Sequence, residues 1–265
     1  MIPPGRSVAA RQTVPKVRIA GVPIAAFGFE EALELFLRAP ADGLRLQVHF
    51  CTTHTIVEAH DDPRLRAALQ SGLAVADGLP IAWEGRARGF PIGRVCGPDL
   101  MPALVDRGRA LGARHFFYGG AAGVADQMAE RLAARYPGIV VAGIESPPFR
   151  PLSEVEDGAM VDRLNRARPD FVWVGLGTPK QDHWLADHRD RLDAAALLAV
   201  GAAFDILGGY RVRAPVALQR LGLEWAFRFG QEPRRLGRRY VVANTRFIGL
   251  ALGDLTQRRR RSAGA

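Results

Sequence analysis

Short apolar runs alternate with longer amphipathic stretches along most of this chain. The apolar runs predict β-strands at residues 46–51, 73–76, 115–118, 139–144, 171–174 and 197–200. The amphipathic stretches predict helices at residues 30–38, 55–60, 63–70, 80–88, 99–111, 123–136, 154–168 and 180–192. Strands 171–174 and 197–200 are apolar throughout, as expected when helices cover both faces of a parallel sheet. The alternation predicts an α/β fold: a Rossmann-like, mostly parallel sheet flanked by helices.

Composition narrows the class of protein. The 265 residues are 48% hydrophobic and 24% charged, which excludes a mostly disordered chain and allows one sizeable core. No uncharged stretch approaches the roughly 18 residues that a spanning helix needs, and no apolar signal segment opens the chain. Two cysteines, Cys51 and Cys96, exclude a disulfide framework and are expected in the core. We expect a cytoplasmic protein.

The positive charge is concentrated at one end. The net charge is +9, yet from Arg211 onward 13 arginines face three acidic residues, and the preceding 210 residues carry a net charge of −1. We therefore divide the chain into a disordered lead-in (1–16), the Rossmann-like domain (17–209), an amphipathic appendage (210–257) and a disordered basic tail (258–265). An excess of arginine at one end indicates an anionic partner.

The appendage has helical periodicity. One apolar stripe contains Leu218, Leu221, Trp225 and Phe229, and from residue 234 onward arginines occupy one arc while apolar residues occupy the opposite one. A basic amphipathic helix of this kind favours an anionic membrane surface. Packing of the apolar face on the body is the alternative. Nucleic acid is not expected as a partner, because few aromatic residues interleave with the arginines and no nucleic-acid motif is present.

Ligands of parallel sheets bind at the carboxyl ends of the strands, so we sought chemistry there. Thr52 and His54 follow the first predicted strand, where a threonine hydroxyl can hold a sugar or phosphate, or cap the next helix. Asp77 follows the second, where it could serve as a general base or only begin a helix. Arg94 could pair with a phosphate or with Asp77, and Asp99 could cap a helix.

Glycines follow the later strands. Gly119 and Gly120 lie between a strand and a helix, an arrangement that points backbone N–H groups at a phosphate, although the spacing does not match the dinucleotide pattern. Gly177 and Thr178 precede Gln181, whose amide could read a uracil or sugar edge, with Thr178 as a helix cap. Asp205 follows the last predicted strand and could read nucleoside hydroxyls.

We predict neither a metal nor any other cofactor. No Asp-x-Asp follows a strand, and the spacing of His183 and His188 splits them across a helix, so both are expected on the surface. A bound diphosphate would then need arginines for neutralisation, and the candidates are Arg94, Arg211, Arg213 and Arg220.

The assembled motifs resemble the WecG/TagA/CpsF family of bacterial glycosyltransferases. They are Ala-Asp-Gly-Leu-Pro-Ile-Ala-Trp (76–83), Arg-Val-Cys-Gly-Pro-Asp-Leu (94–100), Phe-Tyr-Gly-Gly (117–120), Val-Gly-Leu-Gly-Thr-Pro-Lys-Gln-Asp (174–182), Val-Gly-Ala-Ala-Phe-Asp (200–205), and Arg-Ala-Pro followed by Leu-Gly-Leu-Glu-Trp (213–225). The resemblance implies metal-independent, inverting transfer from a UDP-sugar to a polyprenyl-diphosphate-linked sugar at the cytoplasmic membrane face, in surface polysaccharide biosynthesis.

The resemblance also implies roles for individual residues. Asp77 matches the general base, Thr52 a threonine near the donor, and Arg94 an arginine that engages phosphate. Gln181 and Asp205 match residues of the nucleotide site, and Arg213 matches a tail arginine that closes over the diphosphate. The family often has asparagine two residues after the threonine, where this chain has His54.

Two questions stay open at this stage. A non-catalytic nucleotide-binding protein recruited to membranes could use the same fold and would bind UDP without consuming a UDP-sugar. A tail that leaves the body could also pack on a second copy of the chain, so a homo-oligomer remains an alternative.

Overall fold

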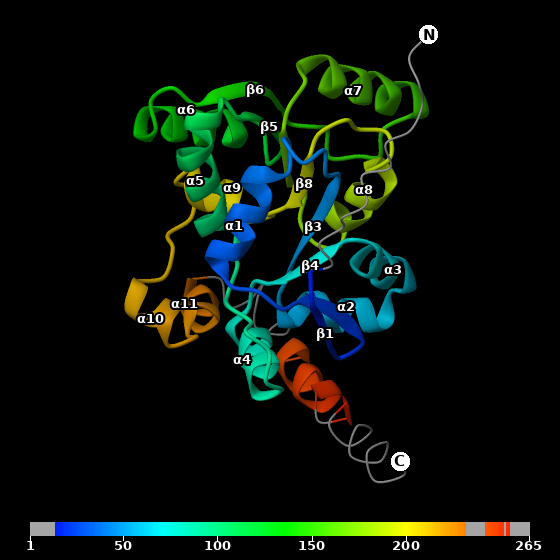
Figure 1. The fold of residues 1–265 in the computed structure, drawn as a ribbon, viewed down its shortest axis with the longest axis vertical. Coiled ribbons are helices and arrows are strands. Elements are labelled where there is room, and N and C mark those ends of the chain that lie inside the picture. Colours follow the sequence, from blue (N-terminus) through cyan, green and yellow to red (C-terminus); the bar gives the residue numbers. More distant parts are fainter. Residues whose placement is uncertain (1–13, 232–241, 252, 255–265) are drawn as a thin grey trace.

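The computed structural model describes residues 14–231, 242–251 and 253–254. Within them, eight strands form one sheet in the order β1-β2-β4-β3-β8-β7-β5-β6, parallel except for the β1–β2 pair (Figure 1). The strands are β1 (Lys16–Ile19), β2 (Val22–Ala25), β3 (Leu46–Cys51), β4 (Leu73–Ala76), β5 (Arg114–Gly119), β6 (Val140–Glu145), β7 (Phe171–Gly175) and β8 (Ala196–Ala199). The predicted Rossmann-like α/β class is confirmed, and strands 46–51 and 73–76 have their predicted bounds.

Helices connect the strands. They are α1 (Phe29–Arg38), α2 (Thr53–Asp61), α3 (Pro63–Ser71), α4 (Leu79–Ala87), α5 (Gly97–Gly108), α6 (Val124–Arg135), α7 (Glu154–Ala167), α8 (Lys180–His188) and α9 (Ala203–Leu207), with a 3₁₀ turn at Arg109–Leu111. The predicted helix 180–192 ends early, at His188, and α9 was not predicted because five residues are too few to show a helical period.

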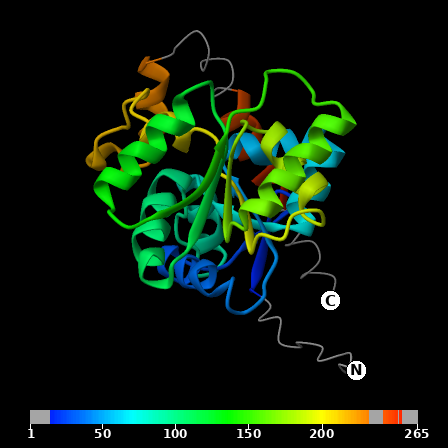
Figure 2. The ribbon, with the colours of Figure 1, turned by 90° about the horizontal axis from the view of Figure 1, so that it is seen from above.

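Alternate strand residues enter two different cores. On β7, Phe171 and Trp173 pack with α1, α5 and α6 on one face, while Val172 and Val174 pack with α7 and α8 on the other. Figure 2 shows helices on both sides of the sheet. A strand buried on both faces has no polar alternation, which is why the apolar runs were recognisable in the sequence.

The β1–β2 hairpin was not predicted. Lys16 pairs with Ala25 in antiparallel register, and the backbone N–H of Ala26 donates to the carbonyl of Pro15. Strand β1 therefore begins at Lys16, the last residue of the predicted lead-in, whose residues 1–13 lie outside the described ones. Each strand has only four residues, too few for a clear two-residue period.

The apolar stripe predicted from Leu218 to Phe229 is divided between two helices. Gly222, with φ of +74°, separates α10 (Val216–Arg220) from α11 (Glu224–Gln231), and the left-handed conformation there ends the first helix. The two helices lie beside the sheet domain, near α4 (Figure 1).

A further helical segment, residues 242–251, packs on the body. Its Ala243, Phe247 and Ala251 are buried, and Phe247 joins the core formed by β1, β2, α2, α3 and α4. Arg246 binds both carboxylate oxygens of Asp61 in α2. The predicted arc at Arg234, Arg235, Arg238 and Arg239 and the predicted tail 258–265 lie outside the described residues. Within the described ranges, every helix is too short or too polar to cross a bilayer.

Candidate active site

A cavity of about 1170 Å³ opens along the carboxyl edge of the sheet. Its wall receives residues from the ends of β4, β3, β8, β7 and β5, the edge where parallel α/β sheets bind ligands. The volume exceeds the roughly 300–1,000 Å³ of typical ligand pockets. There is room for more than one substrate.

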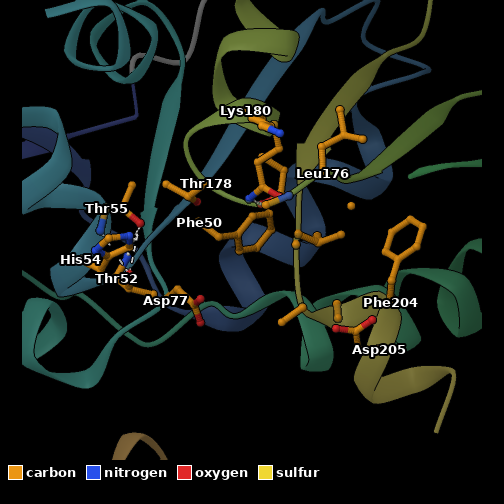
Figure 3. A pocket seen from close by; sticks show the side chains of 18 of the residues that line it. Phe50, Thr52, His54, Thr55, Asp77, Leu176, Thr178, Lys180, Phe204 and Asp205 are labelled. Carbon is orange, nitrogen blue, oxygen red and sulfur yellow. Dashed lines mark hydrogen bonds between the residues drawn. The ribbon is translucent and has the colours of Figure 1, made fainter. Parts of the chain in front are cut away.

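Most of the predicted site residues line this cavity. They are Thr52, His54, Asp77, Arg94, Gly120, Gly177, Thr178, Gln181 and Asp205. Four do not line it: Asp99, Gly119, Arg213 and Arg220. Figure 3 shows Asp77 on the side of Thr52 and His54, with Asp205 and Phe204 of α9 facing it across the cavity.

Asp77 stands directly after β4. Its backbone N–H donates to the carbonyl of Cys51 at the end of β3, with an N···O distance of 2.9 Å, so the two strand ends fix its position. Burial raises the pKa of Asp77 from 3.8 to about 6; the charge of Arg94 opposes that shift, and the charge of Glu224 adds to it. Such a carboxylate is a stronger base than an exposed aspartate and is still ionised at neutral pH.

Arg94 binds both the body and the tail. Its Nε donates to the backbone carbonyl of Asp77 at 2.8 Å, and its Nη2 donates to Oε2 of Glu224 in α11 at 2.6 Å. The sequence left open whether Arg94 meets Asp77 or a phosphate. The structure places its Nε against the main-chain carbonyl of Asp77, and Arg94 is also one of the residues that line the cavity.

Thr52 is the N-cap of α2, as one of its two predicted roles required. Its Oγ1 accepts from the backbone N–H of Thr55 at 3.3 Å, and the two hydroxyls lie 3.1 Å apart. His54, in the first turn of α2, has its Nδ1 3.8 Å from Oε1 of Glu58. Both residues therefore lie at the N-terminal end of α2 and line the cavity there.

Gly119 does not line the cavity, but it allows two strands that end there to lie close together. With φ of +123°, it brings β5 so close to β7 that a Cβ atom would lie 2.7 Å from the carbonyl of Gly175. Any larger residue would separate these strand ends. Gly120, the next residue, lines the cavity itself, before α6.

Gln181 holds two strand ends together. Its Oε1 accepts from the backbone N–H of Gly177 at 3.0 Å, and its Nε2 donates to the carbonyl of Ala199 at 2.8 Å. Because the side chain is buried and both polar atoms already have backbone partners, Gln181 braces the β7–α8 turn. The predicted cap at Thr178 is wrong: α8 begins at Lys180 with Pro179 before it and no capping side chain.

Asp205 lies in α9, after β8. Its Oδ2 lies 2.9 Å from Nε of Arg211, and its backbone carbonyl accepts from the N–H groups of Tyr210 and Arg211. The carboxylate therefore brings a tail arginine to the cavity wall, which Arg211 also lines.

The two other predicted tail arginines lie outside the main cavity. Arg213 forms a two-pronged pair with Asp99, and its Nη2 lies 2.8 Å from Oδ2. Burial alone would raise the pKa of Asp99, but hydrogen bonds from Arg213 and the Cys96 thiol lower it overall. Arg220 is exposed. Asp99 is thus a partner of Arg213 in the first turn of α5 and not a side-chain cap.

The tail supplies cavity residues that were not predicted. Glu224, Trp225 and Arg228 of α11 line it, and so does Asn244, whose Oδ1 accepts from the Thr53 hydroxyl at 2.9 Å. Glu224 and Arg228 are spaced by one helical turn, a signal the sequence offered. Asn244 lies 191 residues from Thr53, and no sequence pattern links them.

Comparison with known proteins identifies the family. The model of the glycosyl transferase WecG/TagA/CpsF family matches residues 17–261. This chain belongs to that family. It is 32% identical, over 193 residues, to an N-acetylglucosaminyldiphosphoundecaprenol N-acetyl-beta-D-mannosaminyltransferase of Bacillus spizizenii, covering 70% of this chain and 73% of the relative. It is 27% identical, over 192 residues, to the enzyme of that name from Staphylococcus aureus strain MW2, covering 72% and 71%. The resemblance drawn from the motifs is confirmed.

Two predictions about other side chains of this glycosyltransferase can be checked. His188 is buried, against the surface location predicted, with its Nε2 2.9 Å from Oδ1 of Asp157 and its ring stacked on Trp184. Cys51 and Cys96 are buried and unpaired, as predicted, and burial raises the pKa of both thiols. Across the described ranges, no cluster of three metal-ligating side chains is found.

Proposed function

We propose that this protein transfers a hexose or N-acetylhexosamine from a UDP-sugar to a polyprenyl-diphosphate-linked sugar, with Asp77 as general base. The observation that carries the proposal is Asp77 itself: a carboxylate at the end of β4, on the wall of a large cavity, with a pKa of about 6. The names of the relatives support the acceptor class, because both describe transfer to a sugar on diphosphoundecaprenol.

The two sides of the cavity suit two substrates. The glycine-rich ends of β5, β7 and β8, with Asp205, form one side and would hold the UDP moiety, whose phosphates can meet backbone N–H groups at a helix start. The other side, formed by the ends of β3 and β4, carries Asp77, Thr52 and His54 and would receive the acceptor sugar. This arrangement puts the base beside the acceptor hydroxyl.

The chemistry is a single displacement. Asp77 removes the proton of the acceptor hydroxyl, whose oxygen forms a bond to the anomeric carbon as the bond to the UDP oxygen breaks, with inversion. Negative charge develops on departing UDP, and the cationic side chains on the cavity wall, Arg94, Arg211 and Arg228, would stabilise it. Because these arginines supply the compensating charge, the proposed mechanism needs no metal.

The appendage would bind an anionic membrane surface. Exposed apolar side chains gather near its two short helices: Leu221, Trp225 and Phe229 are 63%, 43% and 39% exposed, and Trp83 of α4 is 49% exposed. A Cβ on Gly222 would lie 2.8 Å from the Trp83 ring, so α4 and the appendage form one continuous surface. Apolar side chains beside a strongly basic sequence favour insertion between anionic lipid headgroups.

The test measures UDP release from a panel of UDP-sugars, with a short-chain polyprenyl-diphosphate-sugar acceptor and with a chelator present. Release that requires the acceptor and one particular donor supports a metal-independent transferase and names its sugar. Binding of UDP without release from any donor, across several acceptors, would favour the non-catalytic nucleotide-binding alternative.

A further inference from the structure

Glu224 lies at the junction of the tail and the sheet domain. It is in the first turn of α11, and only 16% of its side chain is exposed. Its Oε2 accepts from Nη2 of Arg94, of the sheet domain, at 2.6 Å. Its Oε1 lies 3.7 Å from Nε of Arg213, of the tail. One carboxylate thus stands between two guanidinium groups.

The two arginines on either side of Glu224 have further partners that hold them in place. Arg213 is held by Asp99 of α5, and Arg94 donates to the backbone carbonyl of Asp77. Negative and positive groups therefore alternate from Asp99 to Asp77, and Glu224 is the member that α11 contributes. Without a carboxylate between them, the two guanidinium groups would repel one another.

Arg94 has donors to spare in this arrangement. Its contacts with described residues use Nε and Nη2, while a guanidinium has five N–H groups, and Arg94 lines the cavity. Glu224 therefore fixes the orientation of Arg94 and leaves part of the guanidinium for an anionic substrate.

We propose that Glu224 is a positioning residue, the part of the C-terminal segment that fixes Arg94 beside Asp77 when α11 lies on the sheet domain. Glu224 acts through Arg94 and need not touch the reacting atoms. The catalytic consequence rests on the proposed function, in which Asp77 is the base and Arg94 faces the diphosphate. The packing of α11 on the sheet domain and the orientation of Arg94 next to the base Asp77 then depend on one side chain, that of Glu224.

The charges around Asp77 determine the direction in which its pKa should change when Glu224 is replaced. The groups that face it are Arg94, Cys96 and Asp99 near the start of α5, Glu224 and Arg228 of α11, and Cys51 of β3. Glu224 raises the pKa of Asp77 through its negative charge. Removing that charge should therefore lower the pKa of Asp77.

The experiment titrates the Asp77 carboxyl by ¹³C NMR in the full chain, with the signal assigned by its loss in Asp77→Asn. In Glu224→Gln we expect the midpoint to fall by about one pH unit. Glu224→Asp keeps the charge and shortens the reach, and should shift it less. Asp61→Asn is the matched control, because it removes another ion pair between tail and body, that with Arg246, and Asp61 is the last residue of α2 and does not line the cavity.

The second measurement is the turnover of the variants. In Glu224→Gln the acidic limb of the kcat/KM profile should move with the NMR midpoint, and kcat should fall about tenfold. The loss should vanish when Arg94 is already glutamine, since residues that act through one another are not additive. An unmoved midpoint, an equal shift in Asp61→Asn, or an undiminished loss in the Arg94→Gln background would overturn the proposal. A wild-type protein that transfers no sugar while the midpoint still shifts would instead refute the proposed function alone.

Discussion

Arg94 donates its Nε–H to the backbone carbonyl of Asp77 and not to its carboxylate. Among the described residues, none hydrogen-bonds or ion-pairs with that carboxylate. A direct ion pair would hold the pKa of Asp77 low and make it a weak base. Contact through the main chain keeps the arginine close to the base without neutralising it, which suits an acid–base site that must also accommodate a diphosphate.

Asp77→Asn should lower turnover about 10²–10⁴-fold, the usual contribution of a general base, because asparagine cannot accept the acceptor's proton. UDP affinity, measured by calorimetry, should stay within about threefold of wild type. Asp126→Asn, an exposed aspartate in the first turn of α6, is the control and should change neither. Turnover near the wild-type value in Asp77→Asn would remove Asp77 as the base.

Activity should fall as the pH drops through about 6. Asp77 works only when ionised, and burial raises its pKa from 3.8 to about 6. A profile of kcat/KM against pH should therefore show an acidic limb near 6 and a plateau above it. A limb near 4 would mean that the base is an unperturbed carboxylate and would contradict the assignment.

The same carboxylate should cost stability at neutral pH. Its pKa is higher folded than unfolded, so the folded state binds the extra proton between pH 4 and 6, and stability rises as the pH falls through that window. Asp77→Asn should therefore be more stable than wild type at pH 7.5, by roughly 1–3 kcal/mol, which corresponds to a Tm higher by several degrees. The difference should shrink toward pH 4.5, and calorimetry at both pH values checks it.

Gln181→Ala should destabilise the fold by roughly 1–3 kcal/mol, because it leaves the N–H of Gly177 and the carbonyl of Ala199 without their partner. UDP and CDP binding should weaken alike, since the amide braces the turn and does not read the base. Gln70→Ala, on the exposed face of α3, is the control. An unchanged Tm with a loss confined to UDP would restore the base-reading role predicted from sequence.

Leu221→Ser and Phe229→Ser should each weaken binding to vesicles that contain anionic lipid about tenfold, because each removes an apolar side chain from the proposed membrane surface. Val155→Ser is the matched control: this valine is 83% exposed, but it lies on α7, at the opposite end of the molecule from the appendage (Figure 1). Co-sedimentation measures the binding, and equal losses in all three variants would argue against a specific surface.

The sequence by itself determined the six parallel strands from β3 to β8. Strands 46–51 and 73–76 could be located to the residue, because 73–76 is apolar throughout, 46–51 is apolar at four of its six positions, and turn or polar residues follow both. The strand-end rule then placed Asp77, Thr52, Gly120 and Asp205 around one cavity, since parallel strands end at a common edge. These features depend on the local pattern of apolar residues and on the order of strands and helices, and both can be read directly along the sequence.

Tertiary structure decided which of those side chains remain available for substrate. Gln181 has its amide bonded within the protein, Arg213 is engaged by Asp99, and Arg94 is oriented by Glu224, 130 residues away. Asn244 reaches Thr53 across a still longer separation. Hydrogen bonds and ion pairs of this kind depend on where distant segments pack, and no periodicity in the sequence records that packing.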